Sequence, residues 1–546
     1  MPATPPAMHD LADLLTEAAA ESPDRLAVVE AGGRSLTWAQ LDDEVGRVAT
    51  GLAAAGHVAG YRVLMAVGNR IEFVTTYLGV LRAQLVAVPV NPRGTAGELA
   101  RMIADSGSRT VVADPDTVAT VREAVSLLGR AIDGEVDEVD EVDADLIARA
   151  VKPRVVVIDG ELLPGEHSYD ELRADEARPI PQIQDPEKLA ALLYTSGTSG
   201  RPRAAMLTHR ALLANIEQVA RVQPPMIHGD DVVLGVLPLF HVYGLNAVLG
   251  GVLRHRAKLV LADRFDPQGT LDLIEDEACS VVPVAPPVFA HWDKPDQERS
   301  DDHLEERLGP VRMMLSGSAP LSAELIDRFT QRTGVPVHQG YGLTEAAPVV
   351  TSTLCSRELQ SRSVGAALPG IGLRLVDELG RTPAGEDPGE IQISGPNLFS
   401  GYWPDGSGGP DADGWWSTGD VGFLDATGDL FLVDRLKELV IVSGFNVYPI
   451  EVEDVIREVE GVAEAAVIGV EDELTGEAVV AYVRAPGADP ATVGAAVAAH
   501  CERRLARFKR PSRVEVVDQL PLTGTGKVRK GRLREVERRR ATGLLE

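Results

Sequence analysis

The sequence predicts an α/β fold of layered, largely parallel sheets, and two observations lead to this expectation. Between residues 62 and 158, short apolar runs rich in Val, Leu and Ile alternate with longer amphipathic runs. The apolar runs have the length of strands buried on both faces, and the amphipathic runs have the length of helices. Strands that alternate with helices pair in parallel, because the helix returns the chain to the starting edge of the sheet. A chain of 546 residues favours roughly two to four domains.

The alternation begins with a predicted strand at Arg62–Gly68 (RVLMAVG), followed by a predicted helix in IEFVTTYLGVLRA. The runs LVAVPVNP, TVVAD and VVVID continue the series of strands. A later stretch, Val232–Leu253, contains no Asp, Glu, Lys or Arg and is long enough to span a bilayer. Pro238, Asn246 and several glycines interrupt it. We therefore predict a buried strand that leads into a buried helix, with no membrane span.

Composition excludes several classes of protein. The formal net charge, 53 − 82 = −29, argues against unspecific binding of nucleic acid or anionic lipid. Cys279, Cys355 and Cys501 are far apart and form no zinc or disulfide pattern, which fits a reducing cytoplasm. The N-terminus lacks a basic segment followed by an apolar one, so we expect a cytoplasmic protein. The acidic segment Asp133–Asp145 is expected to be a solvated loop or helix face without a function of its own.

The amino-acid composition changes in the C-terminal third of the chain. Gly and Pro are frequent between Pro369 and Gly414, which predicts short β-hairpins and surface loops. The run DRLKELVIVSGFNVYPIEVEDVIREVEGV then opens a second, smaller α/β pattern that continues to the end. We place a domain boundary here and expect an N-terminal domain of residues 1–436 and a C-terminal domain of residues 437–546.

A loop rich in Ser, Thr and Gly follows an apolar strand in Leu193–His209 (LYTSGTSGRPRAAMLTH). Hydroxyl groups and exposed backbone N–H groups are suited to wrapping a polyphosphate, although many such loops are flexible turns. The loop is not a Walker A motif. The only Gly-Lys pair, Gly526-Lys527, is followed by Val528 and has Pro521 at the position where that motif requires glycine.

The whole string resembles the phosphate-binding motif TSGTTGxPKG of the adenylate-forming superfamily, which includes acyl-CoA synthetases, nonribosomal-peptide adenylation domains and beetle luciferases. Ser199, Arg203 and Ala204 depart from that pattern. Arg203 keeps the cation of the usual lysine and can bind phosphate through a planar fork. The resemblance implies that the ATP phosphates are bound by Thr195, Ser196, Gly197, Thr198, Ser199, Gly200 and Arg203.

Further motifs resemble that family and follow its order along the chain. Leu315–Leu321 (LSGSAPL) resembles the adenine-side loop, which implies that Gly317, Ser318 and Ala319 lie along the purine. In the next motif, QGYGLTE, the resemblance assigns nucleotide binding to Gln339, Gly340, Tyr341 and Gly342, with the adenine stacked on Tyr341. It also implies that Thr344 bonds the α-phosphate and that Glu345 holds Mg²⁺, a cation that requires carboxylate oxygen.

The remaining motifs lie toward the C-terminus. WWSTGD resembles the ribose motif, in which Asp420 accepts from both sugar hydroxyls and Arg435 contacts the same sugar. PLTGTGKVRK contains Lys527, which by the resemblance contacts the acyl carboxylate and the α-phosphate during adenylation. Taken singly, Tyr341 could be a core residue, Asp420 a turn residue and Lys527 a solvated charge. The motifs in their family order identify the chain as a member of the superfamily.

The resemblance also implies the architecture. We expect a large N-terminal domain of layered α/β subdomains plus a β-rich subdomain, and a small mobile C-terminal α+β domain. The C-terminal domain is expected to rotate about Lys437 between two half-reactions, and the loop around Ser443 and Gly444 would then line the path of the thiol. ATP, Mg²⁺ and coenzyme A are the expected cofactors.

The expected reaction is AMP-forming ligation of a carboxylic acid, most consistent with a medium- or long-chain fatty acid, to coenzyme A. His241 begins an apolar segment that lines the acyl pocket in the family, and it would gate the pocket or orient the carboxylate, unless it is a half-buried structural histidine. An aromatic acid, transfer to a free-standing carrier protein, an oxygenase and a nucleotide sensor without chemistry are the alternatives. The sensor is disfavoured because Glu345, Asp420 and Lys527 are all present. The sequence has no pattern that predicts an oligomeric state.

Overall fold

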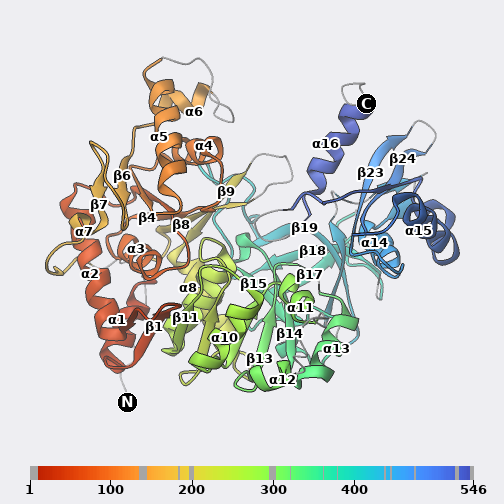
Figure 1. Ribbon diagram of the computed structural model, residues 1–546, viewed down its shortest axis with the longest axis horizontal. Coiled ribbons are helices and arrows are strands. Elements are labelled where there is room, and N and C mark those ends of the chain that lie inside the picture. Colours follow the sequence, from red (N-terminus) through yellow and green to blue (C-terminus); the bar gives the residue numbers. More distant parts are fainter. Residues whose placement is uncertain are drawn as a thin grey trace. The chain divides into compact units, whose positions relative to one another are not determined.

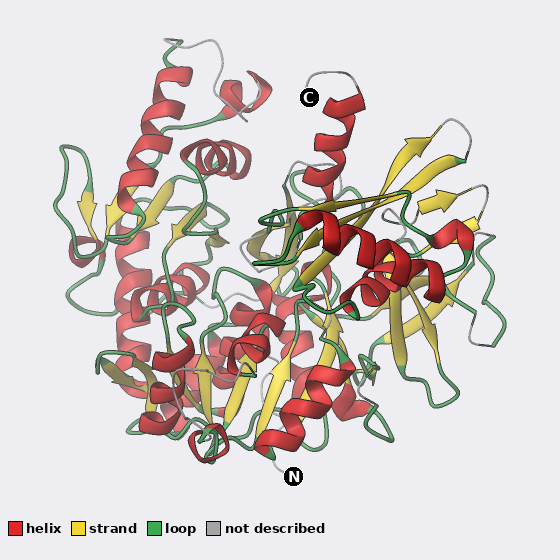
Figure 2. Cartoon of the chain, turned by 45° about the vertical axis from the view of Figure 1, so that its right-hand side comes forward, coloured by secondary structure: helices red, strands yellow, loops and turns green. Residues whose placement is uncertain are grey.

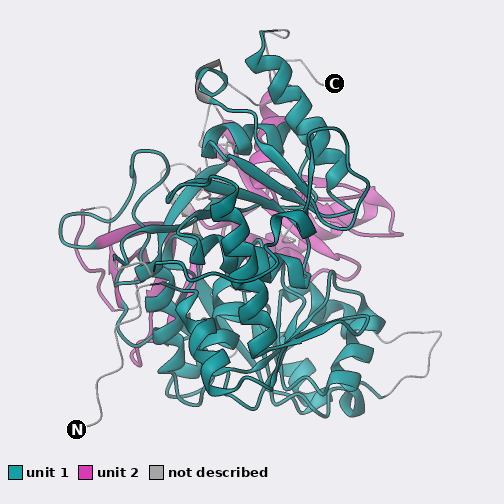
Figure 3. Ribbon diagram, turned by 90° about the vertical axis from the view of Figure 1, so that its left-hand side faces the viewer, with its two compact units in different colours: residues 1–195, 202–371, 394–414 teal, residues 196–201, 372–393, 415–546 magenta. Residues whose placement is uncertain are grey.

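The computed structural model describes residues 10–134, 144–181, 185–195, 202–293, 303–319, 321–360, 362–377, 379–385, 387–435, 438, 440–442, 445–472, 475–522 and 528–541. The chain forms two compact units, which Figure 3 colours separately. The first unit comprises residues 1–195, 202–371 and 394–414, and the second comprises residues 196–201, 372–393 and 415–546. The domain boundary expected between residues 436 and 437 falls outside the described residues and stays a prediction.

A seven-stranded sheet occupies the N-terminal part of the first unit, in the order β7-β6-β5-β3-β4-β8-β9 (Figure 1). Its strands are β3 (Arg62–Ala66), β4 (Val86–Pro89), β5 (Thr110–Ala113), β6 (Arg154–Val157), β7 (His167–Ser168), β8 (Leu189–Thr195) and β9 (Arg203–Thr208). The pairs are parallel except β8–β9, which is antiparallel. The strands expected in RVLMAVG, LVAVPVNP, TVVAD and VVVID are therefore confirmed.

The helices of this part are α1 (Asp13–Glu21), α2 (Trp38–Ala54), α3 (Ile71–Arg82), α4 (Ala96–Ser106), α5 (Val118–Ile132), α6 (Ala144–Arg149), α7 (Tyr169–Leu172) and α8 (His209–Ala220). Capping side chains mark the start of several of these helices, namely α2, α4, α7 and α8. For example, Thr95 and Glu98 form a reciprocal capping box at the start of α4, and Gly107 ends that helix at a φ of 61°. Apolar side chains of α4 and α5 pack on one face of the sheet. Helix α3 contacts strands of this sheet and β1 of the next.

A second sheet of the same unit has nine strands in the order β16-β15-β14-β13-β12-β10-β11-β1-β2. They are β1 (Leu26–Glu30), β2 (Ser35–Thr37), β10 (Val232–Gly235), β11 (Lys258–Leu261), β12 (Val281–Val284), β13 (Met313–Ser316), β14 (Val337–Gly342), β15 (Val349–Ser352) and β16 (Ala366–Ala367). The six from β14 to β1 are parallel, and β2, β15 and β16 are antiparallel to their neighbours. One face packs against the apolar sides of α10 (Pro267–Glu277), α11 (Pro286–Trp292), α12 (Leu304–Arg307) and α13 (Ala323–Thr333). Figure 2 shows these helices in red beside the yellow strands.

The uncharged stretch Val232–Leu253 forms strand β10, a turn at Pro238 and then a buried helix, as expected. The first part of that helix, η1 (Tyr243–Gly250), is a π-helix, and the chain continues as α9 (Gly251–His255). π-Helical turns are rare and often mark functional sites. Among the described residues, no helix has both the length and the apolar character that crossing a membrane requires.

The second unit contains two antiparallel-rich sheets. The four-stranded sheet has the order β17 (Gly372–Val376), β18 (Gly389–Ser394), β19 (Trp415–Leu424) and β20 (Leu430–Arg435). The five-stranded sheet has the order β22 (Phe445–Val447), β21 (Val440–Val442), β24 (Gly476–Arg484) and β23 (Glu464–Asp472), with β25 (Arg513–Val516) parallel to β24. Helices α14 (Pro449–Arg457) and α15 (Pro490–Arg504) pack on one face of this sheet and α16 (Lys530–Ala541) on the other. The expected small C-terminal α+β domain is thus present.

Two ionisable side chains far apart in sequence meet in the core of the first unit. Asp10 and His209 are 4% and 0% exposed, and Asp10 Oδ1 lies 3.3 Å from His209 Nδ1. The Leu11 N–H donates to the same Nδ1, so this nitrogen carries no proton and the imidazole is neutral. Burial raises the pKa of Asp10 to about 7 and lowers the pKa of His209 to about 4. A proton taken up between these values therefore resides on Asp10.

This pair predicts how stability depends on pH. The folded pKa of Asp10 is raised, so its contribution to stability is present below pH 3.8 and is lost as the pH rises through about 7. Asp10→Asn removes this pH-dependent contribution to stability. The wild type should therefore lose roughly 1–3 kcal/mol of unfolding free energy relative to Asp10→Asn between pH 5 and pH 8. Urea unfolding at both pH values measures the difference, with Asp24→Asn, an exposed aspartate, as the control. If the difference in unfolding free energy between the wild type and Asp10→Asn did not change with pH, the raised pKa of Asp10 would be refuted.

Candidate active site

The motifs of the first unit lie at one edge of each sheet, because each of them follows the carboxyl end of a parallel strand. In the nine-stranded sheet, β10 leads to His241, β13 leads to Gly317 and β14 leads to Thr344. In the seven-stranded sheet, β8 ends at Thr195, where the predicted phosphate loop begins. Ligands of open α/β sheets bind at this edge. The fold therefore brings together motifs that the sequence spreads over 150 residues from Thr195 to Glu345.

A buried asparagine joins the two sheets at this edge. Asn69, which follows β3, donates through Nδ2 to the carbonyl oxygens of Gly235 at 3.1 Å and Leu237 at 2.9 Å. Its Oδ1 accepts from the Leu239 N–H at 2.9 Å. The segment that leads to His241 is thereby fixed on both sides. No motif of the sequence points to Asn69, because its partners lie on another sheet.

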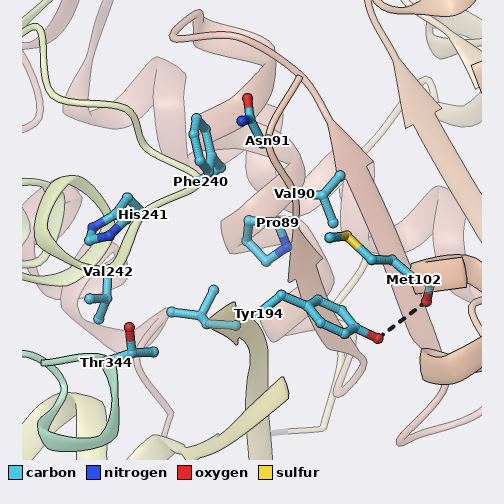
Figure 4. Close-up of a pocket in the computed structure, with 10 residues that line it drawn as sticks. Pro89, Val90, Asn91, Met102, Tyr194, Phe240, His241, Val242 and Thr344 are labelled. Carbon is cyan, nitrogen blue, oxygen red and sulfur yellow. Dashed lines mark hydrogen bonds between the residues drawn. The ribbon is translucent and has the colours of Figure 1, made fainter. Parts of the chain in front are cut away.

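A pocket opens between these carboxyl ends (Figure 4). His241, Val242 and Thr344 lie on one side and Val90, Met102 and Tyr194 on the other. The full lining is Pro89, Val90, Asn91, Met102, Leu193, Tyr194, Phe240, His241, Val242 and Thr344. Most of these side chains are apolar, and His241 and Thr344 provide polar atoms. A pocket of this kind suits an organic acid with an apolar body.

Two tyrosines of this region are held as neutral phenols. The Tyr194 hydroxyl donates to the Asp105 carboxylate at 2.8 Å, and the same oxygen lies 3.3 Å from the Met102 carbonyl oxygen. Burial, followed by the charge of Asp105, raises the pKa of Tyr194 well above its usual value. Burial alone raises the pKa of Tyr243, whose hydroxyl lies 3.4 Å from the Leu315 carbonyl oxygen. Neither phenol ionises at neutral pH, so both act as donors or as apolar surface.

His241 is half-buried, and its Nδ1 lies 3.5 Å from the backbone N–H of Tyr243. It lines the pocket. Its role as a gate or as a carboxylate-orienting group stays a prediction.

The predicted adenine loop lies against the start of the π-helix. A Cβ on Gly317 would be 2.8 Å from the Tyr243 ring, so glycine is required for this close approach. Ser318 has a φ of 73°, an uncommon conformation for a residue other than glycine, and such strain gathers at functional sites. Buried Gln339 accepts the Leu321 N–H through Oε1 at 3.3 Å and so fixes the far end of the loop. Ala319 lies in the same loop and is half-buried.

The next motif forms β14 and the turn after it. Gly340 and Gly342 allow close pairing with β15, because added Cβ atoms would lie 2.6 Å from the Thr351 oxygen and 2.4 Å from the Pro348 oxygen. Tyr341 is 7% exposed, and its N–H donates to Thr351 Oγ1. Its role in stacking on adenine stays a prediction.

Glu345 lies in the short 3₁₀-helix η2 (Thr344–Ala346) and is 8% exposed. Its Oε1 accepts the hydroxyl of Tyr402 at 2.7 Å. Among the described residues, Oε2 has no hydrogen-bond partner, and no group of three or more His, Cys, Asp or Glu side chains is arranged to hold a metal. A single carboxylate together with substrate phosphates is the usual way in which proteins hold Mg²⁺. The donor set therefore fits a metal that arrives with ATP.

The expected ribose residues lie on adjacent strands of the second unit. Asp420 on β19 is half-buried and is paired in register with residue 435 on β20. The Asp420 N–H donates to Thr418 Oγ1 at 3.1 Å, which fixes the backbone at the carboxylate. The register pairs Asp420 with residue 435 across the two strands, and their shared contact with the ribose stays a prediction.

The described residues on either side of Lys527 contact each other. Leu522 and Val528 form an antiparallel bridge, and the Arg529 N–H donates to the Pro521 carbonyl at 2.7 Å. Lys530 Nζ makes ion pairs with Glu453 at 2.8 Å and Glu438 at 3.1 Å. Lys530 is thereby tied to α14 and to the segment before β21. Several site residues lie outside the described residues, namely Ser196, Gly197, Thr198, Ser199, Gly200, Lys437, Ser443, Gly444 and Lys527.

The expectation of surface loops is wrong for the segment before Tyr402. Asn397, Leu398 and Phe399 are 1–3% exposed, and the residues that follow them, 400–403, hydrogen-bond to β9. Tyr402 was not among the expected site residues. A local signal does exist, since aromatic Tyr402 and Trp403 follow Gly401 within a segment rich in Gly and Pro.

Comparison with known proteins identifies the family. The family described as AMP-binding enzyme matches residues 15–403, and the family described as AMP-binding enzyme C-terminal domain matches residues 451–527. A long-chain-fatty-acid–CoA ligase of Bacillus subtilis is 32% identical over 540 residues, covering 96% of this chain and 94% of that protein. The 4-coumarate–CoA ligase-like 9 of Oryza sativa is 33% identical over 531 residues, covering 94% of this chain and 90% of that protein.

Among solved structures, ATP-bound MatB from Rhodopseudomonas palustris is 32% identical, with a TM-score of 0.82. The match covers 96% of this chain and 98% of that one. The chain belongs to the family of AMP-binding enzymes, which confirms the expected superfamily and fold class. It is an ATP-dependent, AMP-forming acid–CoA ligase.

Proposed function

We propose that the protein activates a medium- or long-chain fatty acid as its acyl-adenylate and then transfers the acyl group to coenzyme A. The apolar lining of the pocket beside His241 and Thr344 is the observation that carries this proposal. An apolar lining binds a hydrocarbon chain in proportion to the area that it removes from water. Similarity to a long-chain-fatty-acid–CoA ligase supports the same substrate class.

In this proposal each chemical task of the reaction has a residue. The hydroxyl and glycine loop that begins at Thr195, together with Arg203, binds the ATP phosphates, and Asp420 and Arg435 bind the ribose. Thr344 bonds the α-phosphate, and Glu345 holds Mg²⁺, which when bound neutralises phosphate charge. Lys527 neutralises the charge that develops as the carboxylate attacks the α-phosphorus and pyrophosphate leaves. The thiolate of coenzyme A then attacks the acyl carbon and AMP leaves.

The two half-reactions place different demands on the C-terminal part. Lys527 must contact the α-phosphate in the first step, whereas the thiol must reach the same acyl carbon in the second. We propose that a rotation about Lys437 separates the two, and that the loop around Ser443 and Gly444 then lines the approach of the thiol. Hinges of this kind are a few residues at the ends of elements that absorb a change in φ and ψ.

Chain length tests the substrate class. The KM of saturated acids should fall about fourfold for each added methylene until the pocket is full, which corresponds to roughly 0.8 kcal/mol per buried methylene. Pyrophosphate release with acids from acetate to palmitate measures this dependence, with benzoate and 4-coumarate in the same panel. An aromatic acid is the second candidate, because a 4-coumarate–CoA ligase-like protein matches equally well. If the KM did not change with chain length and 4-coumarate were turned over rapidly, the aromatic acid would replace the fatty acid as the proposed substrate.

A further inference from the structure

A tyrosine that belongs to none of the motifs lies between the two charged residues proposed to act on the ATP phosphates. Tyr402 donates its hydroxyl to Glu345 Oε1 at 2.7 Å. The guanidinium carbon of Arg203 lies 3.7 Å from the centre of the Tyr402 ring, a cation–π contact. A carboxylate and a guanidinium are therefore held by the same side chain, one at its hydroxyl and the other on its ring.

The backbone of Tyr402 is held in a turn by two hydrogen bonds. Its N–H donates to the Ser407 carbonyl at 2.9 Å, and its carbonyl accepts the Gly406 N–H at 2.8 Å. Gly401 has a φ of 93°, and a Cβ there would lie 2.0 Å from the Gly406 oxygen. This turn therefore requires glycine immediately before the tyrosine.

The turn is also attached to the strand that carries Arg203. The Met206 N–H donates to the Gly401 carbonyl at 3.0 Å, and the Trp403 N–H donates to the Ala204 carbonyl at 2.9 Å. The ring of Phe399 packs edge-on against Tyr402, with centroids 5.0 Å apart. The ring thus has a defined position relative to β9 before any ligand binds.

The hydroxyl of Tyr402 donates a hydrogen bond to one oxygen of the Glu345 carboxylate and makes none to the other oxygen. A phenol donates a single hydrogen bond, so it occupies Oε1 of Glu345, and Oε2 has no partner among the described residues.

We propose that Tyr402 is a positioning residue that orients the Glu345 carboxylate toward Mg²⁺ and the Arg203 guanidinium toward the ATP phosphates. The proposal rests on the proposed function, in which Glu345 holds the metal and Arg203 binds phosphate. Tyr402 touches neither the acid nor the reacting atoms in this scheme. It links the phosphate loop to the metal site, so that the two charges are placed together.

Tyr402→Phe tests the hydroxyl, because it removes one oxygen and keeps the ring beneath Arg203. We expect the Mg²⁺ concentration for half-maximal pyrophosphate release to rise about tenfold, which is the scale for losing a hydrogen bond to a charged group. Calorimetry without acid gives a readout that does not require turnover. The Kd of MgATP should rise about tenfold, and the Kd of ATP in EDTA should stay within twofold of the wild type.

Tyr402→Leu tests the ring. Loss of the cation–π contact releases Arg203, so the Kd of ATP in EDTA should now rise as well, by about threefold or more.

The matched control for Tyr402→Phe is Tyr61→Phe. Tyr61 also carries an arginine over its ring, with Arg109 at 4.8 Å, but it precedes β3 at the amino end of the sheet, away from the site. This control should change neither Kd nor the Mg²⁺ requirement.

Glu345→Gln and the double variant separate the possible outcomes. If the proposal is right, Glu345→Gln raises the Mg²⁺ requirement and Tyr402→Phe adds no more than twofold on that background. Two outcomes would refute the role of Tyr402. In the first, Glu345→Gln raises the Mg²⁺ requirement but Tyr402→Phe leaves it unchanged, as Tyr61→Phe does. In the second, the effects of Glu345→Gln and Tyr402→Phe on the Mg²⁺ requirement multiply in the double variant. If Glu345→Gln leaves the requirement unchanged, the metal assignment fails first and the proposal for Tyr402 fails with it. A lowered thermal midpoint in Tyr402→Phe with an unchanged Mg²⁺ requirement would show a structural role and overturn the proposal.

Discussion

Replacing Lys527 by Ala is expected to slow acyl-adenylate formation by about 10²–10³-fold while thioester formation from supplied acyl-adenylate stays within a few fold of wild type. In the first step the carboxylate attacks an anionic phosphorus, so negative charge builds on phosphate oxygens and a preorganised cation stabilises it. In the second step AMP leaves and no new charge develops on phosphorus. The two half-reactions therefore respond differently to the loss of one cation.

Single-turnover assays on one preparation measure both steps, as pyrophosphate released from ATP and acid and as thioester formed from acyl-adenylate and coenzyme A. Lys509→Ala is the matched control, because Lys509 lies in the same unit in an ion pair with Glu451 at 2.6 Å. Lys509→Ala should leave both rates unchanged. Equal losses in both steps for Lys527→Ala would mean that Lys527 supports the structure of its loop rather than adenylation.

Asp420→Ala is expected to raise the KM for ATP by about 10²-fold or more. A carboxylate that accepts from both ribose hydroxyls forms two hydrogen bonds to a charged group, each contributing about 1.5–3 kcal/mol. The register of β19 and β20 places Asp420 opposite Arg435, which suits two residues that bind one sugar. The hydrogen bond from the Asp420 N–H to Thr418 is made by the backbone and survives the substitution.

The nucleotide provides its own control for this prediction. Wild type should discriminate against 2′-deoxyATP and 3′-deoxyATP by about tenfold each, whereas Asp420→Ala should bind ATP and both analogues almost equally. If Asp420→Ala kept the discrimination of the wild type, the carboxylate would not contact the ribose and another residue would have to be assigned to it.

Features that depend on local pattern were predictable from sequence. Strands buried on both faces, such as β3 and β5, are continuous apolar runs, and the amphipathic run after β3 forms α3 as expected. The positions of His241, Gly317 and Thr344 at one edge of a sheet follow from the parallel pairing of the strands that precede them. Each follows a parallel strand, and parallel strands end at the same edge.

Features that depend on contacts between distant segments were not predictable. Asp10 and His209 are separated by 199 positions (209 − 10), and neither has a neighbour in sequence that marks the pair. Tyr402 reaches Glu345 because residues 394–414 return to the first unit and hydrogen-bond to β9. The Gly- and Pro-rich composition around it favours turns but carries no information about what those turns contact. The π-helix at Tyr243–Gly250 shows no period different from that of an apolar α-helix.

The product balance with coenzyme A tests the central claim most directly. The protein is incubated with ATP, Mg²⁺, coenzyme A and either decanoate or 4-coumarate, and pyrophosphate, AMP and acyl-CoA are quantified over time. The proposed function predicts equal amounts of the three products, faster with decanoate than with 4-coumarate, and pyrophosphate without AMP release in a single turnover that lacks coenzyme A. Formation of ADP and phosphate would contradict the adenylate mechanism. Pyrophosphate without acyl-CoA, together with acylation of an added phosphopantetheinyl carrier protein, would contradict coenzyme A as the acceptor.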